Sequence, residues 1–125
     1  MSLNLPAAIL THWNAQGALP SLWLEYVPEP VDVPIALLEA TGFSRDYISA
    51  GMKQDTFNYK ISLLTTSAET TWSTAETAMS HMQGMAGEKI VSINISPDNM
   101  AKPAQMGKVD VWVFEFSLDI QVFDN

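Results

Sequence analysis

The stretch that decides the fold is Val109–Phe123, VDVWVFEFSLDIQVF. Successive side chains of a β-strand point to opposite faces, so every second residue of this run shares a face. One face is apolar throughout, whereas the other becomes polar halfway along. The apolar face holds Trp112, Phe114, Phe116, Leu118, Ile120 and Val122, and the other face holds Val111, Val113, Glu115, Ser117, Asp119 and Gln121. The alternation predicts one β-strand with a buried face and a half-polar face.

The predicted strand is unusually long. At about 3.3 Å per residue it reaches about 45–50 Å, whereas strands of globular domains usually have about 5–6 residues. Such a strand outgrows the core of a small domain. We therefore expect the sheet to project beyond the monomer and to pair with another chain.

The composition is that of a folded protein, with 47% hydrophobic and 10% aromatic residues in a chain of 125. This length predicts a single domain, residues 1–125, which can bury a core without cross-links. The chain has no cysteine, so it has no disulfide, thiol nucleophile or cysteine-based metal site. No signal-peptide pattern is found in the first residues, and no apolar run of about 18–20 residues predicts a membrane span.

Acidic residues dominate the charge. Fourteen Asp and Glu stand against six Lys and Arg, which gives a formal net charge of −8. A chain of this charge repels nucleic-acid phosphates, so tight DNA binding is not expected. Solubility alone explains such a balance, and the same balance suits a surface past which DNA slides without adhering.

Two helices are predicted, at Asn4–Gln16 and Ser67–Gln83. An asparagine cap and a C-terminal glycine bound the first helix. Capping-box spacing at Thr66 and at Ser73 gives two possible starts for the second. The buried stripe of the second helix is predicted to hold Trp72, Ala75, Met79 and Met82.

Strands are predicted before the last one at Ser21–Val27, Pro34–Thr41, Phe57–Thr65 and Glu88–Ser96. The run Pro34–Thr41 fits a helix or a strand, and the proline at its start favours a strand. Gly42 is expected to end it. The segments Gly42–Thr56 and Pro97–Lys108 are expected to be irregular, polar loops.

These elements predict the α+β class. The expected fold is a mostly antiparallel sheet of four to five strands, with two helices packed on one face and one unusually long C-terminal strand. The last two strands are expected to pair as a hairpin across a connection of about 12 residues, which is longer than most.

No catalytic or metal-binding motif is found in the sequence. His12 and His81 each stand alone on a predicted helix, without a ligand three or four residues away, so we interpret them as packing or surface residues. The sequence contains neither a nucleophile elbow nor a phosphate-binding loop. Pairs of carboxylates arise by chance among fourteen acids. We therefore expect no catalytic residue, no cofactor and no metal.

The order and spacing of these pieces resemble the tail terminator (tail completion) proteins of tailed bacteriophages and prophages. The resemblance is one of pattern and covers nearly the whole chain. The final strand is longer than the family implies, which leaves a tail tube or other neck protein as an alternative. The matching pieces are the helix before Gly17, Tyr26–Pro28, Pro34–Leu38, Phe57–Thr65, Thr74–Met79 and the two closing strands.

The resemblance implies a non-enzymatic structural virion protein. Proteins of this family form a ring, typically a hexamer, which caps the finished tail tube and joins it to the head. The implied partners are further copies of the chain, the tail tube, and the head-completion or connector proteins, without a membrane. DNA would pass through the ring without specific binding. The implied location is the tail or neck of the virion, after assembly in the host cytoplasm.

Two groups of residues are expected to serve this function. Four residues of the last strand would line the lumen of the ring: Glu115, Ser117, Asp119 and Gln121. Contacts between subunits or with partners are expected in the segments Arg45–Asp55 and Asp98–Lys108. The residues chosen in these segments are Arg45, Asp46, Lys53, Asp55, Met100 and Met106.

Two other functions fit the same pattern. One is a small ligand-binding or enzymatic α+β domain, with a curved sheet around an apolar pocket. Such a pocket needs convergent polar groups among apolar walls, and the face from Trp112 to Val122 offers none. The other is a tube subunit of a phage tail or of an injection system.

Overall fold

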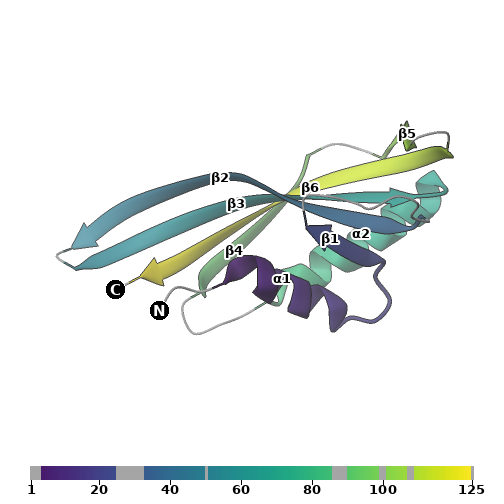
Figure 1. Cartoon of the computed structure of the whole chain (residues 1–125). Helices are drawn as coiled ribbons and strands as arrows, with labels where there is room; N and C mark the ends of the chain where they lie inside the picture. The colour runs from purple at the N-terminus through teal and green to yellow at the C-terminus, as the bar shows by residue number, and fades with distance from the viewer. Residues whose placement is uncertain are drawn as a thin grey trace.

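The computed structural model describes residues 4–24, 33–49, 51–85, 90–98, 101–106 and 109–124. Two helices and a six-stranded sheet build an α+β fold (Figure 1). The predicted class is confirmed, with one strand more than expected. The helices are α1 (Leu5–Asn14) and α2 (Ala68–Gln83), and the strands are β1 (Ser21–Leu24), β2 (Ile35–Ser49), β3 (Met52–Thr65), β4 (Ile90–Pro97), β5 (Lys102–Met106) and β6 (Val109–Asp124).

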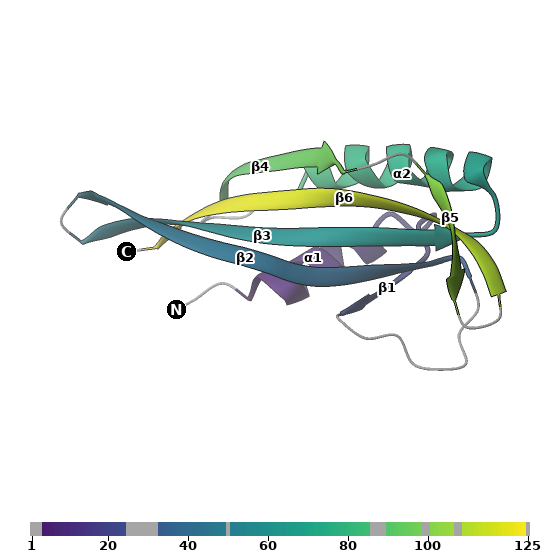
Figure 2. The ribbon, with the colours of Figure 1, turned by 90° about the horizontal axis from the view of Figure 1, so that it is seen from above.

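The long C-terminal strand β6 is the organising element of the sheet. The strand order is β1-β2-β3-β6-β4, and β5 also pairs with β6. On one edge β6 pairs with β3 from Trp112 to Asp124, and on the other it pairs with β5 near its start and with β4 near its end. All pairings are antiparallel except that of β1 with β2. Seen from above, β4, β6, β3 and β2 lie side by side (Figure 2).

Both helices lie on the same side of the sheet (Figure 1). The side chain of Asn4 caps α1 by accepting from the Ala7 amide at 3.2 Å. The cap of α2 is Ser67, which accepts from the Thr70 amide at 3.1 Å. Neither of the two predicted capping boxes is therefore the actual start of α2. The two caps satisfy amides that would otherwise have no partner in the first turn.

The core lies between the helices and the apolar face of β6, as the alternation predicted. The largest side chains buried on that face are Phe114, Phe116, Leu118 and Ile120, each 0% exposed. The helices contribute Leu5, Ile9, Trp13, Ala75, Ala78 and Met82. Burying one such large side chain is worth about 1.5–3 kcal/mol, so this face is the main source of stability.

The predicted stripe of α2 is wrong at one position. Trp72 is 48% exposed, and Thr71 is buried in its place. The two residues are neighbours on the helix, about 100° apart, so the stripe is rotated by one residue at its start. The Trp72 ring still contacts the core edge-on, with its centroid 5.7 Å from that of Phe114.

The predicted loop Gly42–Thr56 is wrong, because most of it is strand. Strand β2 continues through Gly42 to Ser49, and β3 begins at Met52, so the two form a long hairpin with Gly51 at a φ of 79° in its turn. A bulge between Ala40 and Gly42 shifts the alternation. The hairpin end extends beyond the helices (Figures 1 and 2), so neither face there needs a continuous apolar row. Without that row the sequence pattern resembles a loop.

The predicted loop Pro97–Lys108 also contains a strand. Lys102–Met106 forms β5 and pairs with Val109–Val113 of β6. The antiparallel pairing of β4 with β6 is confirmed. Strand β5 is short and contains Pro103, and a proline in a short run argues against a strand when only sequence is read.

Candidate functional site

The side of the sheet opposite the helices carries a continuous polar surface, which we call the polar face. It spans four strands, and its side chains stand in rows across them. One row holds Ser44, Thr56, Gln121 and Ser92, the next Gly42, Asn58, Asp119 and Asn94, and the third Glu39, Lys60, Ser117 and Ser96. The four residues predicted to line a lumen, Glu115, Ser117, Asp119 and Gln121, all belong to this face.

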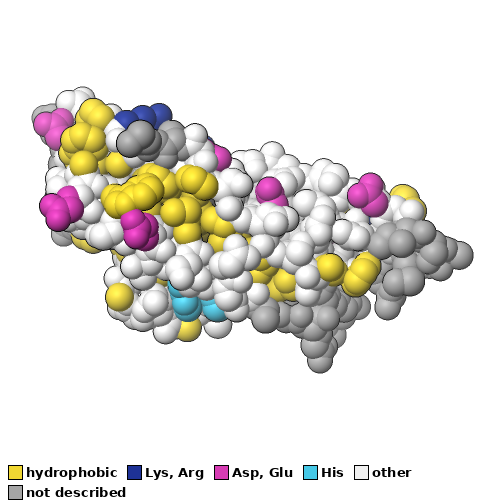
Figure 3. All heavy atoms as spheres, turned by 180° about the vertical axis from the view of Figure 1, so that it is seen from behind, with side chains coloured by type: hydrophobic (Ala, Val, Ile, Leu, Met, Phe, Trp, Pro, Cys, Tyr) yellow, Lys and Arg dark blue, Asp and Glu magenta, His cyan; other side chains and the backbone are white. Residues whose placement is uncertain are grey.

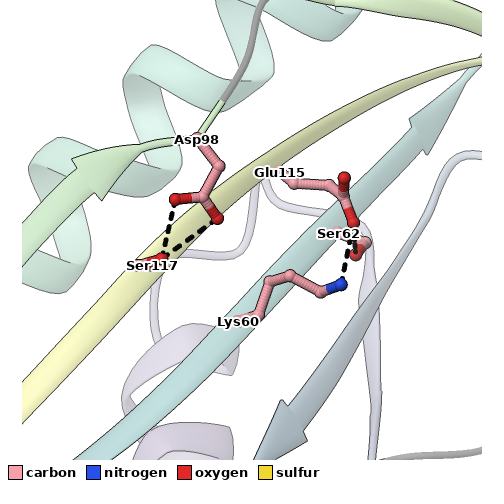
Figure 4. A network of polar contacts seen from close by, with 5 residues as sticks. All are labelled: Lys60, Ser62, Asp98, Glu115 and Ser117. Atoms are coloured by element: carbon pink, nitrogen blue, oxygen red, sulfur yellow. Dashed lines mark hydrogen bonds and ion pairs between the residues drawn. The ribbon is translucent and has the colours of Figure 1, made fainter. Parts of the chain in front are cut away.

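A network of hydrogen bonds and an ion pair lies at the centre of this face (Figure 4). Lys60 Nζ lies 3.0 Å from Glu115 Oε2, and the Ser62 hydroxyl donates to the same oxygen at 3.3 Å. On the other side of β6, the Ser117 hydroxyl contacts the two Asp98 carboxylate oxygens at 2.7 and 3.0 Å. Asp98 follows β4, so this network ties β3, β6 and the end of β4 together.

The other two predicted residues are also tied to neighbouring strands. Asn58 Nδ2 donates to Asp119 Oδ1 at 2.6 Å, and the Ser92 hydroxyl donates to Gln121 Oε1 at 2.6 Å. Gly42 stands beside Asn58, and a Cβ atom there would lie 3.1 Å from Asn58 Oδ1. The prediction that Gly42 ends a strand is therefore wrong. Gly42 is a position within β2 where a side chain would crowd Asn58.

The polar face is acidic. Lys60 is surrounded by the carboxylates of Glu39, Asp98 and Glu115, and its pKa is raised, chiefly by the hydrogen bond to Glu115. Asp119 adds a further carboxylate in the next row. Among the described residues at the centre of the face, Lys60 is thus one cation among the carboxylates of Glu39, Asp98, Glu115 and Asp119. Such a surface repels polyanions, and several of its side chains are hydrogen-bonded to one another.

The polar face ends toward the start of β6, where the sequence turns apolar. Val111 is buried and Val113 is half-buried on this side of the strand. Leu64 of β3 stands opposite Val113. The predicted change from apolar to polar halfway along β6 is thus present in the structure.

The predicted contact residues Arg45, Asp46, Lys53 and Asp55 lie on the β2–β3 hairpin, not in a loop. Arg45 and Asp55 stand opposite each other and form a two-point ion pair, with Nε–Oδ1 2.6 Å and Nη2–Oδ2 2.9 Å. Asp55 is only 4% exposed, and the hydrogen bond from Arg45 lowers its pKa. Asp46 is exposed and faces Gln54, and Lys53 faces Tyr47.

The side chains of the two methionines predicted as contacts lie outside the part of the chain that the structure describes. Met100 lies outside the described residues, and of Met106 only the backbone is described, at the end of β5. The chosen segment Asp98–Lys108 nevertheless contains Asp98, whose contact with Ser117 the sequence did not indicate.

The structure brings together two histidines that the sequence places on separate helices. The rings of His12 and His81 are stacked, with centroids 4.1 Å apart, and His12 Nε2 lies 2.8 Å from the carbonyl oxygen of His81. His81 Nε2 lies 2.5 Å from that of His12. Figure 3 shows the histidines at the surface, at the lower rim of the view from behind. Their spacing of 69 residues gives no sequence signal, and the pair joins α1 to α2.

Shallow hollows flank this histidine pair on the helices. One of about 540 Å³ is lined by Gln16, Glu76, Thr77, Ser80 and His81. Within the described ranges, no group of three or more His, Cys, Asp or Glu side chains could hold a metal ion. The same part of the chain contains no helix long and apolar enough to cross a membrane.

Comparison with known protein families and with curated proteins finds no match to this chain.

Proposed function

We propose that this chain is a non-enzymatic structural protein of a virion. Its role would be that of a ring-forming tail terminator at the head–tail interface. The ring, a hexamer by the resemblance of the sequence, would cap the tail tube and let DNA pass. The observation that carries this proposal is the acidic polar face, which holds Glu115, Ser117, Asp119 and Gln121 on the side of the sheet without helices.

A channel wall for DNA needs a surface that does not retain phosphates. The polar face meets this need because the carboxylates at its centre outnumber Lys60, and the carboxylate of Glu115 forms an ion pair with that lysine. The donors of Asn58, Ser92 and Ser117 are also used within the face. These three donors are not free to bind a passing phosphate, and like charge keeps the DNA away from the wall.

The uneven covering of the sheet supports the same function. Both helices lie on one side, so a ring of such subunits can place a bare sheet toward the lumen and helices toward the outside. The hairpin end of β2 and β3 projects beyond the helices and offers a strand edge to a neighbour. A tail tube or injection-system tube subunit would use the same geometry.

The first test is the native mass together with electron microscopy of the purified protein. We expect a mass six times the 13.8 kDa of one chain and ring-shaped particles. A particle that stays monomeric or dimeric and binds a small molecule would favour the ligand-binding alternative.

The second test asks which face lines the lumen. Asp119→Lys adds a cation to the polar face, and Glu76→Lys makes the same change on the exposed surface of α2. We expect rings of Asp119→Lys to retain double-stranded DNA at low salt and to release it as salt rises. Rings of Glu76→Lys should retain much less. Equal retention by both variants would contradict the lumen assignment.

A further inference from the structure

We propose that copies of this chain join through two strand edges: the outer edge of β2 from Glu39 to Tyr47, and the outer edge of β4 in the next copy. The proposal rests on the ring-forming part of the proposed function and names the surfaces that close the ring. The occupant of the β2 edge is thus the β4 edge of a second copy.

The outer edge of β2 is open over most of its length. Strand β1 pairs only with Ile35–Leu38, and in the described parts of the chain no other strand pairs with this edge. Every described side chain from Ala40 to Tyr47 is exposed. Two of them are aromatic: Phe43 is 54% exposed and Tyr47 is 74% exposed.

Open edges are usually protected against pairing by shortness, proline or charge. Strand β1 has four residues, and β5 has five, including Lys102 and Pro103. The open part of β2 is longer than either and contains no proline. It therefore lacks the shortness and the proline that protect the other two edges, as is expected of an edge that has a partner.

The two proposed edges lie at the same level along the strands. Phe43 stands opposite Phe57, Phe57 opposite Ile120, and Ile120 opposite Ile93 of β4. Strand β4 is thus the edge strand on one side of the sheet, at the same level along the strands as the open part of β2 on the other side. A neighbouring copy needs little axial shift to bring its β2 beside this β4.

The strand directions also agree. Strand β2 is antiparallel to β3, β3 to β6, and β6 to β4. It follows that β4 is antiparallel to β2. When a second copy is related by rotation about an axis along the strands, its β2 therefore lies antiparallel to the β4 beside it. The contact is heterologous, because it joins two different edges, and repetition of such a contact closes a ring when the rotation closes.

Charge favours the contact in a chain whose net charge is −8. Strand β4 contains no charged residue, and the β2 edge from Glu39 to Tyr47 contains one arginine, one glutamate and one aspartate. The two edges thus meet without like-charge repulsion. One β4 carbonyl, that of Ile93, already accepts from Gln83 Nε2 at 2.7 Å, and a carbonyl oxygen has a second lone pair for another donor.

Disulfide trapping tests the proposal directly, because the chain has no cysteine of its own. Ser44 of β2 and Ser92 of β4 stand in one row of the polar face. In the double variant Ser44→Cys, Ser92→Cys, we expect mild oxidation to produce a ladder of covalent oligomers that ends at the ring. Each single variant should remain a single chain on a denaturing gel.

Each other outcome overturns the proposal in a recognisable way. Covalent dimers of Ser44→Cys alone would mean that two β2 edges pair about a two-fold axis. No cross-link in a protein whose native mass is that of a ring would mean that other surfaces join the copies, and the proposed function would stand. No cross-link and a monomeric mass at millimolar concentration would reject both.

A second variant examines the exposed aromatic side chain at the hairpin end. Tyr47→Lys places a charge beside the proposed contact, and Thr77→Lys places the same charge on the exposed surface of α2. Both positions are exposed, so both monomers should fold. We expect at least a tenfold higher dissociation constant for Tyr47→Lys and no change for Thr77→Lys. Equal effects of the two substitutions would overturn the proposal.

Discussion

The two faces of β6 differ in what holds them in place. On the helix side, Phe114, Phe116, Leu118 and Ile120 have no exposed surface and pack against α1, α2 and one another. On the polar face, the alternating residues remain partly exposed and bind neighbouring strands through hydrogen bonds. One face therefore supplies stability through burial, and the other is free to serve a function.

The largest effect is expected on the helix side. Phe116→Ala should lower the free energy of unfolding by about 3–5 kcal/mol, because it leaves a cavity in a fully buried cluster. Urea denaturation followed by tryptophan fluorescence measures this change. The matched control is Ser117→Ala, the next residue on the opposite face, for which we expect at most about 1 kcal/mol. Similar losses for the two variants would contradict the statement that the helix side of β6, and not the polar face, supplies most of the stability.

The ion pair of the hairpin should give an intermediate effect. Arg45→Ala leaves the carboxylate of Asp55 nearly buried without its two-point partner, so it should lower the free energy of unfolding by less than Phe116→Ala and by more than Glu115→Gln. The control is Asp46→Ala, because Asp46 is exposed and follows Arg45 in the chain. This substitution should leave the free energy of unfolding nearly unchanged. A neutral Arg45→Ala would indicate that this end of the hairpin contributes nothing to the stability of the monomer.

The same pair predicts a pH dependence. The pKa of Asp55 lies below its ordinary value of about 3.9, because Arg45 hydrogen-bonds the charged form. Ionised Asp55 therefore stabilises the fold above that ordinary value, and this stabilisation is lost as the pH falls through the lower pKa of the folded protein. Unfolding measured from pH 6 to pH 2 should be less pH-dependent in Asp55→Asn than in the parent. Identical profiles would count against the ion pair.

The smallest effect is expected at the centre of the polar face. Glu115→Gln should cost about 0.2–1 kcal/mol, because Lys60 and Glu115 form a partly exposed pair. The pKa of Lys60 is raised, so the stabilisation is present below the ordinary lysine value of about 10.4 and is lost as the pH rises through the raised pKa. Thermal unfolding at pH 8 and pH 11, at low and high salt, measures both. A loss as large as that of Phe116→Ala would mean that the polar face is part of the core.

How far the sequence predicts the structure follows from the same contrast between faces. Strand β6 was predicted over nearly its full length, because its helix side is apolar at every second residue. The hairpin end was missed because the residues of its outer strand are exposed on both faces, so burial imposes no such alternation on Gly42–Tyr47. Strand β5 was missed for a related reason: it is short, and its pairing with β6 sets its conformation.

The candidate site was predicted only in part. The four residues predicted to line a lumen lie on one face, because alternation along a single strand is a local property. Their partners Asn58, Ser92, Asp98 and Lys60 come from other elements, and no pattern in the sequence names them. The same is true of Asp55, whose partner Arg45 is brought opposite by the register of the hairpin.

By itself, the sequence determined the α+β class, the long last strand with its apolar face, the acidic charge and the two helices. These properties follow from local periodicity, capping and composition, each of which acts over a few residues. Only the tertiary structure decided the strand order, the hairpin, the stacked histidines and the open edges at one level. Those depend on contacts between residues far apart in the chain, which the packing of helices on one face of the sheet selects.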